Sequence, residues 1–296
     1  AYIHARHLTG GPVPIMTGMS KKKPRPTPQP AEYIPQLVDA HTHLTSCGAH
    51  TSAEVGEFVQ RAVDAGVEKI CTVGDGVEES ALALEAAHVN DRVWAACALH
   101  PTRAHELDDA AKKRLADMAA DPRCVAVGET GIDTYWIHHE PEKTATIEQQ
   151  EESLRWHSEL AKKVGKPLMI HNREGDEELF RILDDAPQPD TIILHCFSSP
   201  LAAAKKALER GYILSFAGNV TFKRNTEMRE AAGLAPEGQL LIETDAPYMT
   251  PEPYRGTRNE PAFIGHTAKC VAEARGQSVA DVAAEVSATF DRVYGL

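Results

Sequence analysis

Six side chains of the kinds that bind divalent cations follow short apolar runs in this 296-residue chain. Imidazole nitrogens and carboxylate oxygens are common ligands of such ions. A lone histidine after an apolar run is more often a packed core or loop residue, and a His-x-His pair can be a polar strand edge. Ligand-type residues after five separate runs are better explained by a metal site. The six residues are His41, His43, Glu129, His171, His195 and Asp245.

Six ligands are too many for one catalytic zinc ion, which usually has three protein ligands and an open position. We therefore expect two ions, with His41, His43 and Asp245 around the first. His171 and His195 would hold the second ion, and Glu129 would bridge the two. Such a pair can activate a water molecule, with Asp245 as the candidate general base. A simple ligand or a salt-bridged carboxylate remains an alternative role for Asp245, and Mg, Mn and Zn all remain possible as the metal.

The elements that must position these residues alternate regularly. Continuous apolar runs are typical of strands buried on both faces. Eight such runs occupy residues 37–44, 69–74, 93–99, 124–128, 167–170, 191–194, 212–216 and 240–242. Helical patterns occupy residues 52–65, 78–89, 104–119, 144–164, 178–185, 200–210, 225–232, 264–274 and 279–294. This alternation predicts an α/β fold, a (β/α)8 TIM barrel, whose functional residues lie at the carboxyl ends of the strands.

Composition limits the location and partners of the protein. With 31 Lys and Arg against 43 Asp and Glu, the net charge of −12 argues against broad adhesion to nucleic acid or anionic membrane. A local cationic site remains compatible with this charge, because bound metal ions are strong local positive charges. No apolar run reaches the roughly 18 residues of a membrane span, and no secretory signal is evident. We expect a cytoplasmic protein with free thiols and without a membrane or an obligate protein partner.

Three segments differ in character. Residues 1–18 lack periodicity, and Met19 is a plausible natural start, so we expect these residues to be a remnant of recombinant expression. Residues 19–35 are rich in Lys and Pro and predict a flexible arm. Residues 36–296 are expected to form the barrel.

From about residue 36 to its end, the chain resembles the TatD family of metal-dependent hydrolases, within the amidohydrolase-like barrels. The motifs that carry this resemblance occur in the order in which the family has them. They are LVDAHTHL at residues 37–44, GETGID at 128–133, PLMIHNR at 167–173, LHCFS at 194–198, LIETDAPY at 241–248 and YRGTRNEP at 254–261.

The resemblance implies two divalent cations and phosphodiester hydrolysis, often as a deoxyribonuclease. The family's metal ligands fall on the six residues named above, with Glu129 as the bridge. The Leu99-His100-Pro101 turn matches a motif near the substrate, so His100 is expected to contact the substrate. Guanidinium groups suit phosphate oxygens, and we place Arg173, Arg255 and Arg258 there. Simple salt bridging is the alternative for each arginine.

Three functions remain in view. The leading hypothesis is a phosphodiesterase that acts on DNA ends or single strands, with a compact pocket because aromatic residues are only 6% of the chain. A small-molecule amidohydrolase or esterase for a cyclic amide or ester is the first alternative. It is weakened because related barrels often bridge their metals with a lysine where this chain has Glu129. A catalytically idle barrel used as a binding module is the third, and the intact ligand set argues against it.

Overall fold

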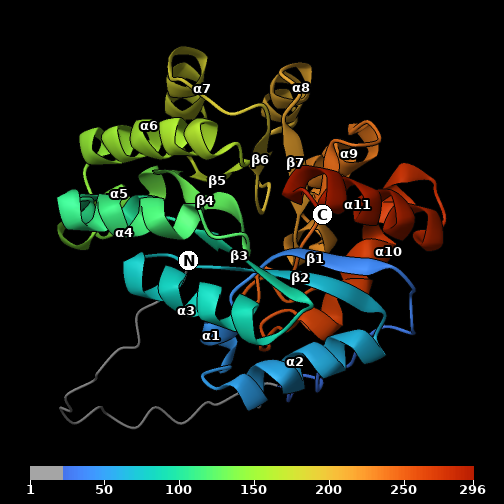
Figure 1. Cartoon of the computed structure of the whole chain (residues 1–296). Helices are drawn as coiled ribbons and strands as arrows, with labels where there is room; N and C mark the ends of the chain where they lie inside the picture. Colours follow the sequence, from blue (N-terminus) through green and yellow to red (C-terminus); the bar gives the residue numbers. More distant parts are fainter. Residues whose placement is uncertain (1–22) are drawn as a thin grey trace, which may run out of the picture.

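The computed structural model describes residues 23–296, in which eight strands form one parallel sheet in the order β1 to β8. Each strand pairs with the next one along the chain, and the helices between them lie outside the sheet (Figure 1). The predicted (β/α)8 barrel is therefore confirmed. The strands are β1 (Leu37–Thr42), β2 (Val67–Val73), β3 (Val93–Cys97), β4 (Cys124–Asp133), β5 (Leu168–Arg173), β6 (Ile192–Leu194), β7 (Ile213–Phe216) and β8 (Leu240–Ile242).

The barrel closes where the carboxyl end of β1 meets the segment after β8. The Asp245 N–H donates to the His41 carbonyl at 2.9 Å, and the His43 N–H donates to the Ala246 carbonyl at 2.9 Å. The buried Asp39 carboxylate accepts from the backbone N–H of Thr244 at 2.9 Å and from its hydroxyl at 2.5 Å. These bonds fix the first and last parts of the barrel together at three of the candidate ligands, His41, His43 and Asp245.

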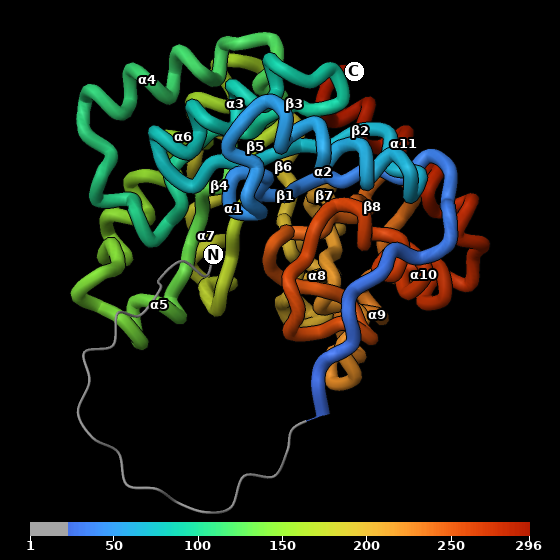
Figure 2. Tube along the Cα trace, turned by 90° about the horizontal axis from the view of Figure 1, so that it is seen from below, coloured from blue at the N-terminus to red at the C-terminus, as the bar shows by residue number. Residues whose placement is uncertain are grey.

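The helices follow the chain around the barrel, from α3 to α6 on one side to α8 to α10 on the other (Figure 2). They are α1 (Leu44–Cys47), α2 (Ser52–Asp64), α3 (Val77–Val89), α4 (Asp109–Ala119), α5 (Thr134–His139), α6 (Ile147–Val164), α7 (Asp176–Asp185), α8 (Leu201–Glu209), α9 (Thr226–Leu234), α10 (Ile264–Arg275) and α11 (Val279–Tyr294). Short 3-10 helices are η1 (Pro101–Glu106), η2 (Pro141–Lys143), η3 (Gly218–Thr221) and η4 (Pro261–Phe263).

Besides shifted element ends and the additional short helices α1 and α5, two elements differ from the prediction. The helix expected over residues 104–119 is divided, because Asp108 accepts from the Ala111 N–H at 2.8 Å and caps α4 there. Strand β4 runs to Asp133, beyond the predicted end at residue 128. Gly131 permits this extension: its φ is +151°, and a Cβ there would lie 1.9 Å from the His171 carbonyl oxygen. Glu129 therefore lies inside β4 rather than after it.

The described part of the predicted arm lies along α10. Ile34 is buried and donates its N–H to the Ala65 carbonyl at 3.3 Å. The His266 ring nitrogen lies 2.8 Å from the Gln29 carbonyl, and Glu32 pairs with Lys269. Residues 1–22, and with them the predicted remnant at 1–18, lie outside the described residues, and the flexibility of the arm stays a prediction. Among the described helices, none is long and apolar enough to cross a membrane.

Candidate metal centre

All six predicted ligands are buried and lie toward the carboxyl ends of five strands. His41 is in β1 and His43 follows it, Glu129 is in β4, and His171 is in β5. His195 directly follows β6, and Asp245 lies just after β8. The most exposed of the six is His171, at 8%. The fold therefore brings residues that are up to about 200 positions apart in sequence into one dry cluster.

Four atoms form a compact first group. His41 Nε2 lies 3.2 Å from His43 Nε2, 3.1 Å from Glu129 Oε2 and 3.3 Å from Asp245 Oδ1. His43 Nε2 lies 3.3 Å from each of the same two carboxylate oxygens. Ligands bonded at zinc distances in a tetrahedral site would be about 3.3 Å apart. These four atoms thus have the spacing of a cation's ligand shell.

A second group surrounds the other oxygen of Glu129. Glu129 Oε1 lies 3.1 Å from His195 Nε2 and 3.2 Å from His171 Nδ1. His100 Nε2 approaches the same oxygen at 3.4 Å. Because the two oxygens of one carboxylate face two separate sets of histidines, Glu129 has the geometry of a bridging ligand.

Unpaired polar atoms support this fit. Buried polar atoms without hydrogen bonds are costly and uncommon. Glu129 Oε2, Asp245 Oδ1 and His100 Nε2 are buried and make no hydrogen bond, although Glu129 Oε2 and Asp245 Oδ1 each lie within 3.3 Å of imidazole nitrogens. The two carboxylate oxygens thus lie beside imidazole nitrogens without accepting a hydrogen bond. The residues present therefore suit divalent cations.

Two further carboxylates, for which the sequence predicted no role, contact the ring nitrogens of ligand histidines that face away from the cluster centre. Glu243 Oε2 lies 3.0 Å from His195 Nδ1, and its Oε1 accepts from the Cys196 N–H at 2.9 Å. Asp133 Oδ2 lies 2.8 Å from His171 Nε2. Glu243 is also close enough to the cluster to be considered a ligand. We assign Glu243 a supporting role rather than a ligand role, because both of its oxygens already have hydrogen-bond partners. Such partners orient the imidazole and raise its basicity.

The pKa shifts of the clustered side chains agree with a site that contains both acidic and basic groups. Burial alone would raise the pKa of the Glu129 carboxyl, but His195 and His41 hold it well below its usual value. Burial alone would lower the pKa of His195, but Glu129 and Glu243 raise it well above its usual range. The Glu129 carboxylate is therefore ionised, as a metal ligand must be.

His100 differs from the other histidines of the cluster. Burial, aided by the neighbouring His171, lowers its pKa well below the usual value, so the ring is neutral. Its Nδ1 accepts from the Thr102 N–H at 3.2 Å. The single ring proton must then be on Nε2, the atom that faces Glu129. His100 thus presents a donor to the centre, as expected of a residue that contacts substrate, rather than an electron pair for a metal.

The three predicted arginines lie at the same end of the barrel. Arg173 ends β5 two residues after His171, and its guanidinium carbon is 3.6 Å from the centre of the Tyr135 ring. Arg255 lies over the Phe222 ring at 3.9 Å. Arg258 donates to the Ser46 carbonyl at 2.6 Å, which gives it a structural contact. Their contact with a substrate stays a prediction.

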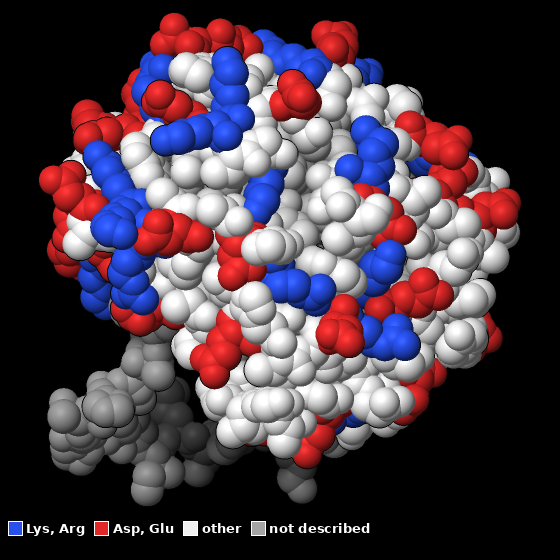
Figure 3. All heavy atoms as spheres, viewed as in Figure 1, with Lys and Arg blue, Asp and Glu red and all other residues white. Residues whose placement is uncertain are grey.

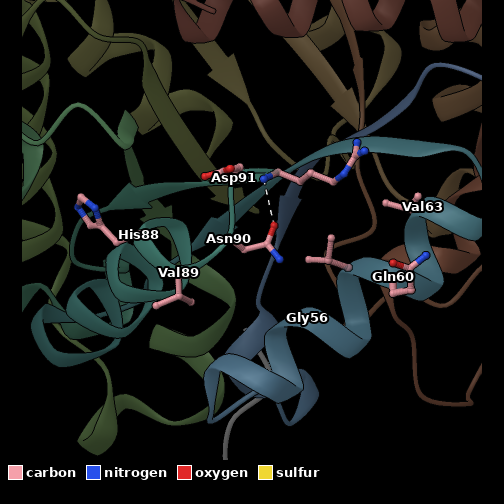
Figure 4. A pocket seen from close by; sticks show the side chains of 9 residues that line it. Gly56, Gln60, Val63, His88, Val89, Asn90 and Asp91 are labelled. Carbon is pink, nitrogen blue, oxygen red and sulfur yellow. Dashed lines mark hydrogen bonds between the residues drawn. The ribbon is translucent and has the colours of Figure 1, made fainter.

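A separate hollow lies between α2 and α3, away from this centre. Its lining includes Gly56, Gln60 and Val63 from α2 and His88 and Asn90 at the end of α3 (Figure 4). The carboxyl ends of the helices face the opposite end of a (β/α)8 barrel from the carboxyl ends of its strands. This hollow contains none of the candidate ligands.

A (β/α)8 barrel with imidazoles and carboxylates gathered at the carboxyl ends of its strands is the arrangement of a class of proteins, the metal-dependent barrel hydrolases. The chain matches the family described as TatD related DNase over residues 38–295. It therefore belongs to the TatD family of metal-dependent hydrolases.

Individual relatives agree with this assignment. "Uncharacterized metal-dependent hydrolase TatD" of Mycobacterium tuberculosis is 47% identical over 260 residues, which is 88% of this chain and 98% of that protein. "3'-5' ssDNA/RNA exonuclease TatD" of Shigella flexneri is 30% identical and covers 88% of this chain and 99% of its own. The crystal structure of YjjV, a TatD homologue from Escherichia coli, superimposes with a TM-score of 0.77 at 27% identity, covering 88% of this chain and 98% of its own.

Proposed function

We propose that this protein hydrolyses phosphodiester bonds in DNA, at ends or in single strands, with two divalent cations per chain. The observation that carries the proposal is the placement of Glu129, whose two oxygens face two sets of ligand atoms at 3.1 to 3.3 Å. His41, His43 and Asp245 would hold one cation, and His171 and His195 would hold the other. When bound, such a pair supplies charge to the phosphoryl oxygens and lowers the pKa of a water molecule.

The residues of the chain have distinct parts in this reaction. Asp245, held at 3.3 Å from both His41 and His43, is the proposed acceptor of the proton that the attacking water loses. Its pKa lies well below the usual value because His41 and His43 outweigh the effect of burial, so it is ionised at neutral pH. His100 Nε2–H would donate to a phosphoryl oxygen. Arg173 would place its guanidinium on the same phosphate.

The choice of nucleic acid as the substrate rests on two considerations. Histidines and carboxylates around two ions suit the in-line displacement of a phosphodiester. A TatD-family relative that matches 88% of this chain carries the name of a single-strand DNA and RNA exonuclease. We infer a cytoplasmic enzyme whose metals are Mg, Mn or Zn.

A cleavage assay with matched active-site variants tests the proposal. The purified chain would be incubated with a labelled single strand in the presence of Mg2+, Mn2+ or Zn2+. We expect cleavage in at least one metal, and a loss of about a hundredfold or more in Glu129→Gln, which keeps the shape of the side chain but removes its charge. Activity equal to that of the variant in every metal would refute the proposal. Hydrolysis of a lactone or lactam panel instead would favour the amidohydrolase alternative.

A further inference from the structure

Two loops at the carboxyl ends of β7 and β8 carry a local excess of positive charge. We call residues 217–225 and 246–259 the loop pair. It contains four cations, Lys223, Arg224, Arg255 and Arg258, and one carboxylate, Glu252, in a chain whose net charge is −12. All five side chains are exposed. On the face shown in Figure 3, in contrast, basic and acidic side chains are interspersed.

The cations of the loop pair have no carboxylate partners among the described residues. Elsewhere on the surface, arginines commonly pair with acids: Arg155 lies 2.9 Å from Asp185, and Arg181 lies 3.0 Å from Glu151. In the loop pair, Arg255 lies over an aromatic ring and Arg258 donates to a backbone carbonyl. Neither contact neutralises charge, so the loop pair remains available to an anion.

The two loops are fixed to each other. The Glu252 N–H donates to the Thr221 hydroxyl at 2.8 Å. The backbones meet so closely that a Cβ on Gly218 would lie 1.8 Å from the Met249 carbonyl oxygen. The Arg255 guanidinium then covers Phe222, the residue next to Lys223. Cations from both loops are thus held in one surface, which lowers the entropy lost when they bind a ligand.

A hollow leads from the segment that carries His195 to this surface. Its lining includes Ser198, Ser199, Arg224 and Asn225, together with Glu227. Ser198 is three residues after His195 and accepts from the Asn219 amide at 3.1 Å. Glu227 is partly engaged, because it accepts from the Leu201 N–H at 3.4 Å. The hollow therefore places hydroxyl groups of the segment after His195 beside the Arg224 guanidinium, which has no carboxylate partner among the described residues.

We propose that the loop pair, through Lys223 and Arg224, binds backbone phosphates of a single strand beyond the phosphodiester at the metal centre. This inference rests on the proposed function and deepens it, because it makes a strand of several nucleotides the substrate rather than a small diester. Loops after the seventh and eighth strands often bind phosphate in such barrels. Contacts with backbone phosphates hold a strand without reading its sequence.

A binding experiment without catalysis tests the loop pair directly. Fluorescein-labelled dodecathymidylate is titrated with protein in EDTA, which prevents cleavage, from about 50 to about 200 mM salt. The double variant Lys223→Ala/Arg224→Ala is compared with the wild type and with Lys162→Ala/Lys163→Ala, which removes two exposed charges from α6. Each phosphate contact in a single strand adds about 0.7 to the salt slope, so the loop variant should lose about 1.4. Its affinity should fall about tenfold, while that of the control variant should not change.

The outcomes separate this inference from the proposed function. A loop variant that matches the control in slope and affinity would overturn the inference. Wild-type protein that binds the dinucleotide TpT as tightly as the dodecamer would also overturn it. With metal added, the ratio of kcat/KM for the dodecamer to that for bis(p-nitrophenyl) phosphate should fall about tenfold in the loop variant. Wild-type protein that binds the dodecamer but cleaves neither compound in any metal would refute the proposed function instead.

Discussion

Glu129 is the residue on which the candidate centre converges. It is 1% exposed, and its two oxygens face different histidines. A buried carboxylate with an unpaired oxygen is unfavourable unless a cation completes its environment. Neighbouring histidines are oriented in turn by Glu243 and Asp133. The candidate metal ligands are thus distinct from the carboxylates that orient the ligand histidines.

Removing the charge of the supporting carboxylates should weaken metal binding, although no metal ligand is lost. We expect Glu243→Gln and Asp133→Asn each to lower metal affinity by about 10- to 100-fold, because His195 and His171 lose the partners that fix their orientation. Competition with a fluorescent chelator measures this affinity. Glu285→Gln on α11, which lies in the scaffold, is the control. Unchanged affinity in both variants would show that these carboxylates only stabilise the fold.

Proton competition should set the acid limit of metal binding. An imidazole binds metal only through an unprotonated nitrogen, so protons and metal exclude each other. Although burial opposes it, nearby carboxylates raise the pKa of His43 and His195 well above the usual value, which extends the competition toward higher pH. We therefore expect metal affinity and activity to decline as pH falls, beginning above the ordinary histidine pKa of about 6.5. A flat profile of activity down to about pH 5 would contradict imidazole ligation.

At the scale of elements, β4 and α6 are joined by a buried histidine. His157 in α6 accepts from the Leu99 N–H at 3.2 Å through Nε2 and lies 2.7 Å from the Ser153 carbonyl through Nδ1. Its Nδ1 is also 3.4 Å from the Thr130 hydroxyl, beside Glu129. These contacts require the neutral ring, so this junction of helix and strands is sensitive to acid.

The pH dependence of stability should reveal this junction. Burial lowers the pKa of His157 from 6.5 to about 4. Between these values the unfolded chain binds the proton more tightly, so the stabilisation is present above the unfolded pKa and is lost as pH falls toward 4. The expected loss is about 2 kcal/mol between about pH 7 and about pH 5. Denaturant unfolding of metal-free wild type and His157→Gln measures it, and parallel pH profiles for the two would contradict the assignment.

The whole molecule is an acidic barrel with its chemistry at one end. Buried charge in the cluster opposes folding unless it is compensated, and cations that bind only the folded chain stabilise it by mass action. The loop pair adds positive charge beside that end. If the substrate is the proposed nucleic acid, this asymmetry would favour its binding at the end where the ligands lie.

Removal of metal should therefore lower thermal stability. At a free metal concentration about a hundredfold above Kd, bound metal adds about 2.7 kcal/mol. For a chain of this size we expect chelation to lower Tm by about 5 °C, reversibly on adding metal back. Differential scanning fluorimetry measures the shift, with Glu129→Gln as the variant that should not respond. Equal Tm values with and without chelator would argue against metal bound within the cluster.

The sequence was informative where the pattern is local. Alternating apolar runs and helical segments predicted the (β/α)8 barrel, and histidines after the runs predicted which side chains would meet. The predicted element bounds were wrong in two places. Strand β4 continues to Asp133 because Gly131 lets it approach the distant His171 carbonyl, and the local Asp108 cap divides a predicted helix. The TatD family membership agrees with motifs that are themselves local.

By itself, the sequence determined the order of elements and the types of the candidate ligands, because apolar periodicity and residue chemistry are written along the chain. The sequence also predicted Glu129 between two groups of histidines. Only the tertiary structure decided that Glu243 and Asp133 support two of these histidines, and that the loops after β7 and β8 lie together. These relations depend on barrel closure, which brings distant residues within hydrogen-bonding range, and spacing along a chain does not encode such distances.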